Sequence, residues 1–546
     1  MKRFASIFPF LEHGSAQLHI GRLVANHDFV KALLRYGTCD EYVFSGPSIE
    51  NLRTFEQTVR RWALPPERLA AIRCMPYAGF SQVLAREAIH VAHVGGWGYF
   101  MPGLHYLRQR ACAPFPITGV TFSLHGREVV DHAVRVSHAG MTDADAIFCI
   151  SRDGREVMRR LLDGAAAITN RAWQGQLLCL PLGIDDDLFD VRGDRVRCRQ
   201  RLRIPDEAVV LLTLGRITPA QKMDLGPWLR TVARGIRPAA HVPIVVVLAG
   251  GASPADLRMV KEHVDAEGIG DIVRVHANFP ADQKADLLAA ADVLVMPTDN
   301  TQETFGLSLI EAQAAGVPIV ASHYDGYKDI VRDGIDGFLI ETLGLEVDPL
   351  ADWFDVMDGN VAQIFQSQAV AIDLDALRDA VVRLVNDAGL RRTMGEAGRV
   401  RAAAEFRFSR IIARYEEAWD ALAARAAARP PSLPVASPWN LDPVTVFGHY
   451  PTRRLEACTE VVATGMPADL LPFSDVTTLV TPRLLATLLS LAETPASVGL
   501  LRAEAAHDVP PTLDAARVVD AAVLWLLKYG LLRQVRADGA GNAAAS

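Results

Sequence analysis

The stretch E-T-F-G-L-S-L-I-E, from Glu303 to Glu311, decides the fold of this chain and continues directly as A-Q-A-A-G-V-P-I-V-A. Its two carboxylates stand eight positions apart, around a Phe-Gly turn and the start of a predicted helix. The backbone N–H groups of Thr304 to Leu307 lie at this helix start, where amides lack helical partners and the helix dipole favours an anion. Free amides for a phosphate beside carboxylates for hydroxyl groups suit a nucleotide sugar. This is the hypothesis that the rest of the sequence has to support.

Length and composition limit the class of protein. A chain of 546 residues is too long for one core and predicts roughly three domains. Half of the residues are hydrophobic and 22% are charged, as in ordinary soluble α/β proteins. The formal net charge of −8 disfavours nucleic acid as a partner. The seven scattered cysteines include no C-x-x-C pair, so they predict neither a disulfide framework nor a zinc site and fit a reducing cytosol.

The N-terminus, M-K-R-F-A-S-I-F-P-F-L-E-H-G, briefly imitates a signal peptide. Pro9 interrupts its apolar run, Glu12 and His13 end it, and no small-residue cleavage site follows, so a first buried strand is the better interpretation. No apolar run reaches the roughly 18 residues of a membrane span. We therefore expect a cytoplasmic protein without a transmembrane segment, with peripheral contact at the inner membrane face left open.

Short β-branched runs alternate with longer amphipathic stretches over roughly 400 residues, which predicts doubly wound parallel sheets. The first half carries predicted strands at Ala5–Phe10, Glu41–Ser45, Ala88–His93, Ile117–Leu124, Ala146–Ile150 and Leu177–Pro181, with helices at His19–Tyr36 and Asp153–Leu162. The second half carries predicted strands at Val209–Leu214, Ile244–Ala249, Ile272–Val275, Val293–Met296, Pro318–Ala321 and Gly337–Ile340. Near-continuous apolar strands of this kind are buried on both faces of a parallel sheet.

Two polar breaks divide the chain. The Arg-rich segment Asp185–Ile204 is interpreted as an interdomain linker, and a Pro/Ala-rich segment near residues 425–438 as a second one. The predicted units are an N-terminal domain (1–190), a second domain (205–405), a helix crossing back to the first domain (406–424), the linker (425–438), a helical accessory domain (439–536) and a disordered tail (537–546). The accessory domain is expected to contain helices at Arg483–Glu493 and Leu513–Tyr529.

Two cations follow a buried strand of the second half. Leu214-Gly215-Arg216 places an arginine at a strand's C-terminal end, and Lys222 lies in the same loop. Ligands of open α/β sheets bind at this edge. An arginine with a lysine is the expected chemistry for a diphosphate, and the anion-ready helix start in the same half favours this role over that of plain surface cations.

The order of these motifs resembles retaining glycosyltransferases of family four. The shared pattern runs from G-R…K at Gly215, through A-G-G at Ala249–Gly251 and A-D-V-L-V-M-P at 291–297, to E-x-F-G-x4-E-A-x-A-x-G-x-P-x-V-A and the pair D-G…D-G-F at 333–338. The resemblance is strong over about 205–340, weaker over 1–185 and absent after about 430. It implies the GT-B fold, which has two facing Rossmann-like doubly wound domains, here followed by a small, mainly helical C-terminal domain.

The resemblance also implies roles for the second-half residues. Arg216 and Lys222 would bind the donor diphosphate, Glu303 the hydroxyls of the transferred sugar, and Glu311 the ribose hydroxyls. The sugar and the diphosphate would meet the backbone at Phe305, Gly306 and Leu307, next to Thr304, and the loop at Asn278 and Phe279 would lie near the base.

First-half matches are weaker. Gly14, in the sequence H-G-S, stands where the family has a Gly-Gly loop beside the diphosphate. The donor could therefore approach this loop differently than in the family. Thr121–His125 resembles the strand whose terminal histidine lies beside the transferred sugar; for His125 an ordinary strand-end histidine is the competing interpretation.

Three further sequence features allow both a functional and a simpler structural interpretation. Asp185-Asp186-Asp187 imitates an Asp-x-Asp metal motif, but a solvated turn in the linker is the favoured interpretation. Trp97, in a Gly-rich turn with Tyr99, would serve either as a stacking platform for an acceptor sugar or in packing. The sequence from Tyr324 to Asp329 replaces the family's usual Gly-Gly and would shape the donor pocket.

The expected function is that of a metal-independent hexosyltransferase of class EC 2.4, which moves a hexosyl group from a nucleoside diphosphate sugar to an unidentified acceptor with retention. No cofactor is expected. The nucleoside diphosphate of the donor substrate is expected to be UDP rather than GDP. A disaccharide synthase or phosphorylase of the same fold and a non-catalytic nucleotide-sugar-binding scaffold remain alternatives. The acceptor (glycan, lipid-linked glycan, small molecule or protein), the oligomeric state and the role of residues 439–546 are not legible in the sequence.

Overall fold

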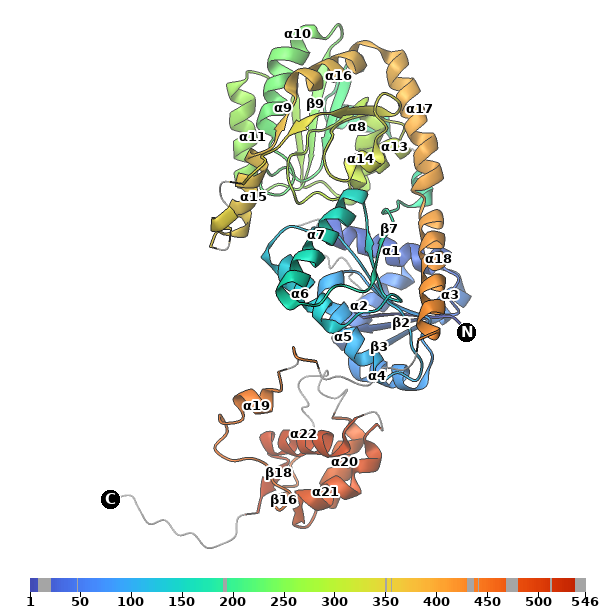
Figure 1. The fold of residues 1–546 in the computed structure, drawn as a ribbon, viewed down its shortest axis with the longest axis vertical. Helices are drawn as coiled ribbons and strands as arrows, with labels where there is room; N and C mark the ends of the chain where they lie inside the picture. Colours follow the sequence, from blue (N-terminus) through green and yellow to red (C-terminus); the bar gives the residue numbers. More distant parts are fainter. Residues whose placement is uncertain are drawn as a thin grey trace, which may run out of the picture.

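The computed structural model describes residues 1–7, 21–46, 48–189, 194–348, 351–354, 356–429, 437–439, 441–467, 480–510 and 513–535. Within them the chain forms two α/β domains stacked along the long axis of the molecule and a smaller C-terminal unit (Figure 1). The two-domain α/β architecture predicted from the alternation of strands and helices is therefore confirmed.

The first domain is built on a seven-stranded parallel sheet in the order β3-β2-β1-β4-β5-β6-β7. Its strands are β1 (Arg3–Ile7), β2 (Glu41–Gly46), β3 (Ile72–Pro76), β4 (Val91–Val94), β5 (Ile117–Val120), β6 (Ala146–Cys149) and β7 (Gln176–Cys179). Its helices are α1 (Gly21–Tyr36), α2 (Ile49–Arg60), α3 (Pro66–Ala70), α4 (Tyr77–Arg86), α5 (Trp97–Arg108), α6 (Arg127–Ala139) and α7 (Arg152–Thr169).

The second domain repeats this plan with a six-stranded parallel sheet in the order β10-β9-β8-β11-β12-β13. Its strands are β8 (Val209–Leu214), β9 (Ile244–Gly250), β10 (Val273–Ala277), β11 (Val293–Met296), β12 (Ile319–Ser322) and β13 (Gly337–Ile340), and a small antiparallel pair, β14 (Thr342–Leu343) and β15 (Ala371–Ile372), follows. Its helices are α8 (Arg195–Arg201), α9 (Leu225–Thr231), α10 (Arg237–Ala239), α11 (Pro254–Ala266), α12 (Lys284–Ala290), α13 (Leu307–Ala314), α14 (Tyr327–Ile330), α15 (Gly359–Gln368), α16 (Leu374–Asn386) and α17 (Ala388–Glu405).

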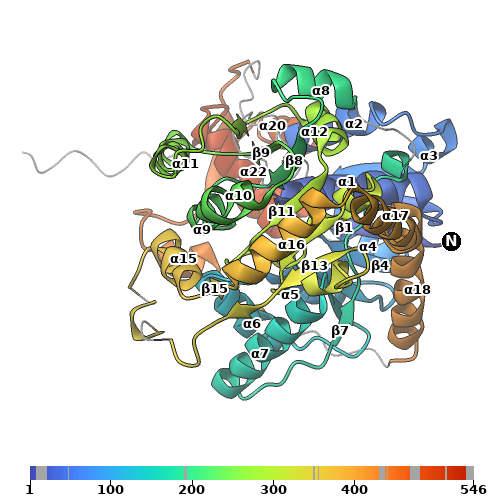
Figure 2. The same ribbon diagram turned by 90° about the horizontal axis from the view of Figure 1, so that it is seen from above.

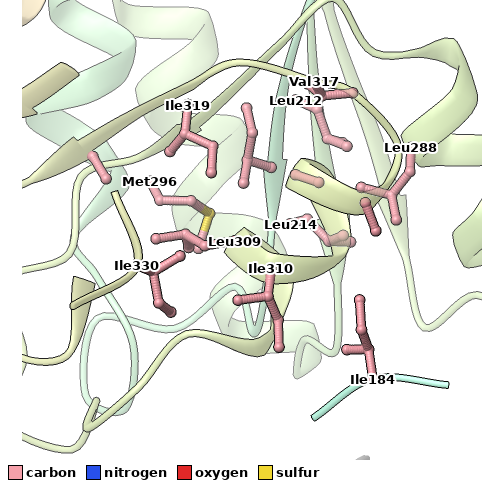
Figure 3. Packing of buried hydrophobic residues seen from close by; sticks show 14 of the residues in the cluster. Ile184, Leu212, Leu214, Leu288, Met296, Leu309, Ile310, Val317, Ile319 and Ile330 are labelled. Atoms are coloured by element: carbon pink, nitrogen blue, oxygen red, sulfur yellow. The ribbon is translucent and has the colours of Figure 1, made fainter. Parts of the chain in front are cut away.

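The core of the second domain lies between its sheet and α13. The strands β8 and β9 are buried at every position, because a parallel sheet covered on both faces leaves no side chain in solvent. Leu309 and Ile310 of α13 pack among Leu214, Met296 and Ile319 of the strands (Figure 3). This packing holds the start of α13 at the C-terminal ends of β8 and β11.

Two long helices connect the domains along one side of the molecule (Figure 1). After α17, helix α18 (Phe408–Ala427) runs back over the first domain, where Trp419 Nε1 donates a hydrogen bond to Thr118 Oγ1 at 3.2 Å. The Lys2 ammonium contacts Asp420 at 2.8 Å. The helix ends three residues later than the sequence predicted. Among the described residues no helix is both long and apolar enough to cross a membrane.

The C-terminal unit combines helices with a small sheet that the sequence analysis did not predict. It contains α19 (Pro443–Phe447), β16 (Glu460–Ala463), α20 (Pro482–Leu491), β17 (Ala496–Ser497), α21 (Val498–Glu504), α22 (Ala515–Lys528) and β18 (Leu532–Gln534). The three strands pair antiparallel in the order β17-β16-β18. Strands of two to four residues are too short to show an alternating pattern. Trp525 and Leu526 belong to the unit's own core.

Three local interpretations need correction. The strand predicted over Ile117–Leu124 ends at Val120, and the remaining residues form the loop into α6. The strand β3 was missed because it lies at the sheet edge and is only half-buried, so its sequence I-R-C-M-P lacks a strong apolar pattern. The supposed linker Asp185–Ile204 contains α8, in which the buried Arg199 binds the Asp292 carboxylate at 2.8 Å. This part of the segment belongs to the second domain.

Candidate active site

A cavity of about 570 Å³ lies between the two domains and collects most of the predicted site residues. Its second-domain wall includes Arg216, Lys222, Asn278, Phe279, Glu303, Thr304, Phe305, Gly306, Leu307 and Glu311. Asp28 and Phe29 of α1 and Phe122 and Ser123 after β5 belong to the first-domain wall. Gly14 lies outside the described residues. The C-terminal ends of two parallel sheets thus face one cavity, as expected for ligand sites of doubly wound folds.

The backbone after β8 presents Arg216 to the cavity through a very close approach of two loops. Gly250 has φ +157°, and a Cβ there would lie 1.7 Å from the Gly215 carbonyl oxygen, so no side chain fits. The Arg216 guanidinium donates to Gln221 Oε1 at 2.5 Å and to the Gln221 carbonyl at 3.1 Å. Burial lowers the pKa of Arg216 from its ordinary value, and the group remains a cation at neutral pH.

Lys222 and Glu303 form an ion pair in the cavity wall. The Lys222 ammonium donates to Glu303 Oε2, and both side chains are almost enclosed, at 12% and 13% exposed. The ring of Tyr327 lies 5.7 Å from the ammonium. Burial lowers the pKa of Lys222 to about 8; the Asp325 carboxylate acts in the opposite direction, and the Arg216 cation lowers the pKa further. This buried cation is available to an anionic ligand only if it shares or leaves its carboxylate partner.

Glu303 folds back over the start of α13. Its Oε1 accepts hydrogen bonds from the N–H groups of Thr304 at 3.1 Å and Phe305 at 3.2 Å, and the Tyr327 hydroxyl donates to Oε2 at 3.3 Å. The expectation that all four amides from Thr304 to Leu307 are unpaired is therefore wrong for the first two. A carboxylate one residue before the turn is close enough to occupy them. Leu307 begins the helix, so its amide has no helical partner.

Gly306 is required at the turn before α13. Its φ is +110°, and a Cβ there would lie 2.6 Å from the Tyr327 ring. The close packing of Tyr327 against this glycine fixes the turn that carries Glu303. The Tyr327 ring, expected from the sequence only to help shape the donor pocket, therefore supports both members of the Lys222–Glu303 pair.

A second lysine–glutamate pair lies at the rim of the cavity. Lys284 Nζ donates to Glu311 Oε1 at 2.5 Å, and the Lys284 side chain is 37% exposed. Asp28 of α1 reaches the same region from the first domain. Burial raises the pKa of Asp28 to about 6, and the cation of Lys284 acts against this rise. Lys284 and Asp28 were not predicted; Lys284, which follows the Asn278–Phe279 loop at the start of α12, had a weak signal in its position, whereas Asp28 had none.

The loop at Asn278 and Phe279, which forms part of the cavity wall, is held in place by side-chain contacts. The Asn278 side chain accepts from the Ala252 N–H at 3.1 Å and donates to the Ala252 carbonyl at 3.0 Å. Asn278 has φ +52°, in the left-handed region that asparagine tolerates. Phe279 stacks on His276 with ring centroids 5.4 Å apart and planes 11° apart. A planar aromatic surface fixed by side-chain hydrogen bonds suits a nucleotide base.

His125 is not among the residues that line the cavity. Its ring contacts Gln363 of α15, with Gln363 Nε2 2.9 Å from His125 Nδ1, so a first-domain histidine contacts the second domain. Burial lowers the pKa of His125 from its ordinary value, and the Arg216 cation acts in the same direction. The ring therefore stays neutral at neutral pH and lies close enough to Arg216 to sense its charge.

Trp97 is a buried core residue, and the acidic triplet Asp185–Asp187 belongs to no metal site among the described residues. Trp97 is 5% exposed and packs edge-on against His132, so it belongs to the core of the first domain rather than to an acceptor platform. Asp185 is partly exposed and forms ion pairs with Lys31 at 2.7 Å and Arg35 at 3.3 Å, and Asp187 of the same triplet is 61% exposed. In the part of the chain that the structure describes, no group of three or more His, Cys, Asp or Glu side chains is arranged to hold a metal ion.

The fold and the site together define the class of protein. Two parallel-sheet domains facing one cavity form the GT-B fold, and solved GT-B proteins have the same arrangement. The Anabaena protein HepE in complex with UDP-glucose is 14% identical, with a TM-score of 0.50 over 77% of this chain and 100% of that structure. Sucrose-phosphate synthase of Thermosynechococcus elongatus is 19% identical, with a TM-score of 0.51 over 78% of this chain and 100% of that structure. These likenesses establish the fold.

The sequence of the second domain establishes the family of that domain. Residues 194–352 match the family model "Glycosyl transferases group 1", so the chain carries a glycosyltransferase group 1 domain. A D-inositol 3-phosphate glycosyltransferase of Geodermatophilus obscurus is 37% identical over 188 residues, which are 34% of this chain and 40% of that relative. The matched region spans at most 40% of the length of the first curated relatives.

Proposed function

We propose that this protein is a metal-independent retaining glycosyltransferase that transfers a hexosyl group from a nucleoside diphosphate sugar, with UDP favoured over GDP, to an acceptor. The observation that carries the proposal is the buried Lys222–Glu303 pair beside Arg216 at the start of α13, inside a cavity between two GT-B domains. Support also comes from the glycosyltransferase names of the relatives and from the UDP-glucose complex of HepE.

The second-domain wall would bind the donor diphosphate. Arg216 and Lys222 supply two cations, and the Leu307 amide supplies a donor at the positive end of a helix. As the glycosidic bond to the diphosphate breaks, negative charge grows on the leaving phosphate, and these fixed groups stabilise it without reorganising. The protein cations thus take the role that a metal ion has in other transferases.

The carboxylates would position the sugars of the donor. Glu303 would exchange its two amide donors for hydroxyl groups of the transferred hexose, which frees the Thr304 and Phe305 amides for the diphosphate. Glu311 would bind the ribose hydroxyls, with Lys284 fixing its orientation. The acceptor hydroxyl would attack from the face of the departing phosphate, which takes its proton, so the configuration is retained. His125 does not line the cavity, so it would orient the hexose from the first-domain side only after its contact with Gln363 of α15 is broken.

Arg216→Ala tests the proposal most directly. We expect it to lower donor hydrolysis and transfer by about 10²–10³-fold, because one preorganised cation is lost at the site of charge development. Arg258→Ala, which removes an exposed arginine of α11, is the matched control and should keep full activity. Circular dichroism should be unchanged in both. Full activity of a folded Arg216→Ala protein would exclude the proposed role.

The same assay separates the alternative functions. A phosphorylase would require inorganic phosphate, and a disaccharide synthase would transfer to a free sugar. A non-catalytic scaffold would bind nucleoside diphosphates, detected as a rise in melting temperature, without hydrolysis or transfer. Donor hydrolysis in the absence of phosphate favours the transferase.

A further inference from the structure

The described residues between 342 and 372 (342–348, 351–354 and 356–372) have an unusual surface. The segment leaves the second domain after β13, returns through the antiparallel pair of β14 and β15, and carries α15 at the periphery of the molecule in two perpendicular views (Figures 1 and 2). Its exposed large hydrophobic residues are Leu343, Leu345, Val347, Trp353, Val356, Val361, Ile364 and Phe365. Single exposed apolar residues are common, but a contiguous group marks an interaction surface.

The helix α15 is inverted relative to an ordinary surface helix. Gln363 and Gln366 face the protein, where they contact His125 at 2.9 Å and the Thr301 hydroxyl at 3.2 Å. Its apolar residues Val361, Ile364 and Phe365, spaced i, i+3 and i+4, are 44%, 39% and 47% exposed. A helix normally buries such a stripe and exposes its polar face. Because here the polar face is inside, the apolar stripe is available to another molecule.

The charge of the segment indicates what that molecule is like. From Glu341 to Ile372 the sequence contains no Lys, Arg or His; its acidic residues are Glu341, Glu346, Asp348, Asp352, Asp355 and Asp358. Glu346 and Asp352 are exposed and directly adjoin the exposed Leu345, Val347 and Trp353 in the sequence. A surface that is both apolar and acidic is complementary to a partner that is both apolar and basic.

We propose that the described residues of this segment (342–348, 351–354 and 356–372) form a docking surface for a basic amphipathic segment of a partner polypeptide. The ten residues of α15 span about 15 Å, which suits a helix or strand laid along the stripe. An anionic membrane surface is disfavoured because the acidic residues would be repelled by it. A second copy in a two-fold interface is disfavoured because it would place the same acidic residues against each other.

The docking surface adjoins the candidate active site. Gln363 contacts His125 and Gln366 contacts Thr301, which lies two residues before Glu303. A partner bound to the outer face of α15 is therefore held at the edge of the interdomain region, on the opposite side of the helix from these two contacts. The docking surface is independent of the proposed transfer reaction, because it rests on exposure and charge outside the cavity.

Direct binding tests the surface. The probe is a fluorescein-labelled peptide of leucine and lysine at helical spacing, about 18 residues or five turns long. We expect saturable binding to the full-length protein by fluorescence anisotropy, weakened by added salt. The triple variant Val361→Ser/Ile364→Ser/Phe365→Ser should bind about tenfold or more weakly, because the anchoring side chains are gone. Glu346→Gln/Asp352→Asn should bind more weakly and with less salt dependence.

Matched variants control for surface changes in general. Ile168→Ser/Val196→Ser/Val400→Ser removes three exposed apolar residues elsewhere, and Glu262→Gln/Glu396→Gln removes two exposed acids elsewhere; both should bind the peptide like the unaltered chain. All substituted residues are exposed, and unchanged circular dichroism and melting temperature verify folding. Absence of peptide binding, or equal binding by all variants, would overturn the proposal.

The other occupants give distinct outcomes. Cosedimentation with vesicles of phosphatidylcholine, with or without phosphatidylglycerol, that is lost in the apolar triple variant would identify a membrane surface and overturn the polypeptide proposal. Sedimentation velocity that shows a dimer in the unaltered chain and a monomer in the triple variant would identify a second copy and overturn it likewise. Donor hydrolysis should be equal in all these proteins, so a failure of the docking surface is distinguishable from a failure of the transferase.

Discussion

The second-domain wall presents two lysine–glutamate pairs, one deep in the cavity and one at its rim. Lys222 and Glu303 are 12% and 13% exposed; in the rim pair Glu311 is buried, at 9% exposed, but its partner Lys284 is 37% exposed. Both pairs join the same residue types close to α13. The enclosed pair has lost most of its hydration, so its ions depend on each other. The Lys284 ammonium remains partly hydrated, so its ion pair contributes little to the free energy of unfolding. Burial, rather than residue type, separates the two pairs, and under the proposed function it also separates the catalytic cation from the binding one.

Removing the deep lysine should have the largest effect. In Lys222→Met, Glu303 keeps its buried charge without its cation, so we expect a loss of about 3–5 kcal/mol in the free energy of unfolding. Donor hydrolysis should fall by about 10²–10³-fold. Urea denaturation and a hydrolysis assay measure the two effects. The double variant Lys222→Met/Glu303→Gln, which leaves no buried ion in this pair, should recover stability but not activity. Equal stability of the single and double variants would show that the pair is not coupled.

The pH dependence should distinguish the deep pair as well. Burial lowers the pKa of Lys222 from 10.5 to about 8, so the unfolded chain binds more protons between these values. The stability contribution of this group is therefore present above 10.5 and is lost as pH falls through about 8. Activity should change in the opposite sense, because the cation disappears as pH rises above about 8. Lys222→Arg, which keeps its charge, should lose this alkaline decline in a pH–rate profile.

Asp28, which reaches the rim pair from the first domain, should make the stability of the protein depend on pH. Its pKa is raised from 3.8 to about 6 by burial, so its stability contribution is present below 3.8 and is lost as pH rises through about 6. Asp28→Asn should therefore stabilise the protein at pH 8, by up to about 3 kcal/mol, and leave its stability near pH 4 almost unchanged. Melting curves at the two pH values measure this difference. A destabilised variant at pH 8 would show that the Asp28 carboxylate is a favourable partner of Lys284.

Removing the rim lysine should have the smallest effect on stability. For Lys284→Ala we expect a loss of about 1–2 kcal/mol, because water that enters where the exposed Lys284 was can hydrate the Glu311 carboxylate. The KM for the donor should rise about tenfold with kcat nearly unchanged, since Lys284 would orient Glu311 for a group remote from the reaction. Steady-state kinetics with Lys261→Ala, an exposed lysine of α11, as the control measures this. A large drop in kcat would place Lys284 with the deep pair.

The strands of the second domain could be predicted closely from the sequence. Val209–Leu214, Val293–Met296 and Gly337–Ile340 occur in the structure with the predicted bounds. Central strands of a parallel sheet are buried on both faces, so their sequences are continuous apolar runs. The edge strand Ile72–Pro76 was missed because half of its surface is in solvent and polar residues are tolerated there.

The site was predictable where the chain itself brings its residues together. Glu303, Gly306 and Glu311 lie on one turn and helix, so local spacing places them in one wall. Asp28 was missed because it comes from α1 of the other domain, and no local pattern connects it with α13. The use of the Thr304 and Phe305 amides by Glu303 was also missed, because it depends on a side-chain direction in an irregular turn.

The sequence by itself determined the two parallel-sheet domains and most of the charged residues of the second-domain wall. Apolar periodicity fixes which strands are buried, and glycines such as Gly306 fix where the backbone must turn. Only the tertiary structure decided which lysine pairs with which glutamate, how deeply each pair is buried, and that α15 turns its apolar stripe outward. Ion pairing and exposure depend on distances and packing between elements far apart in the chain, and linear spacing does not encode them.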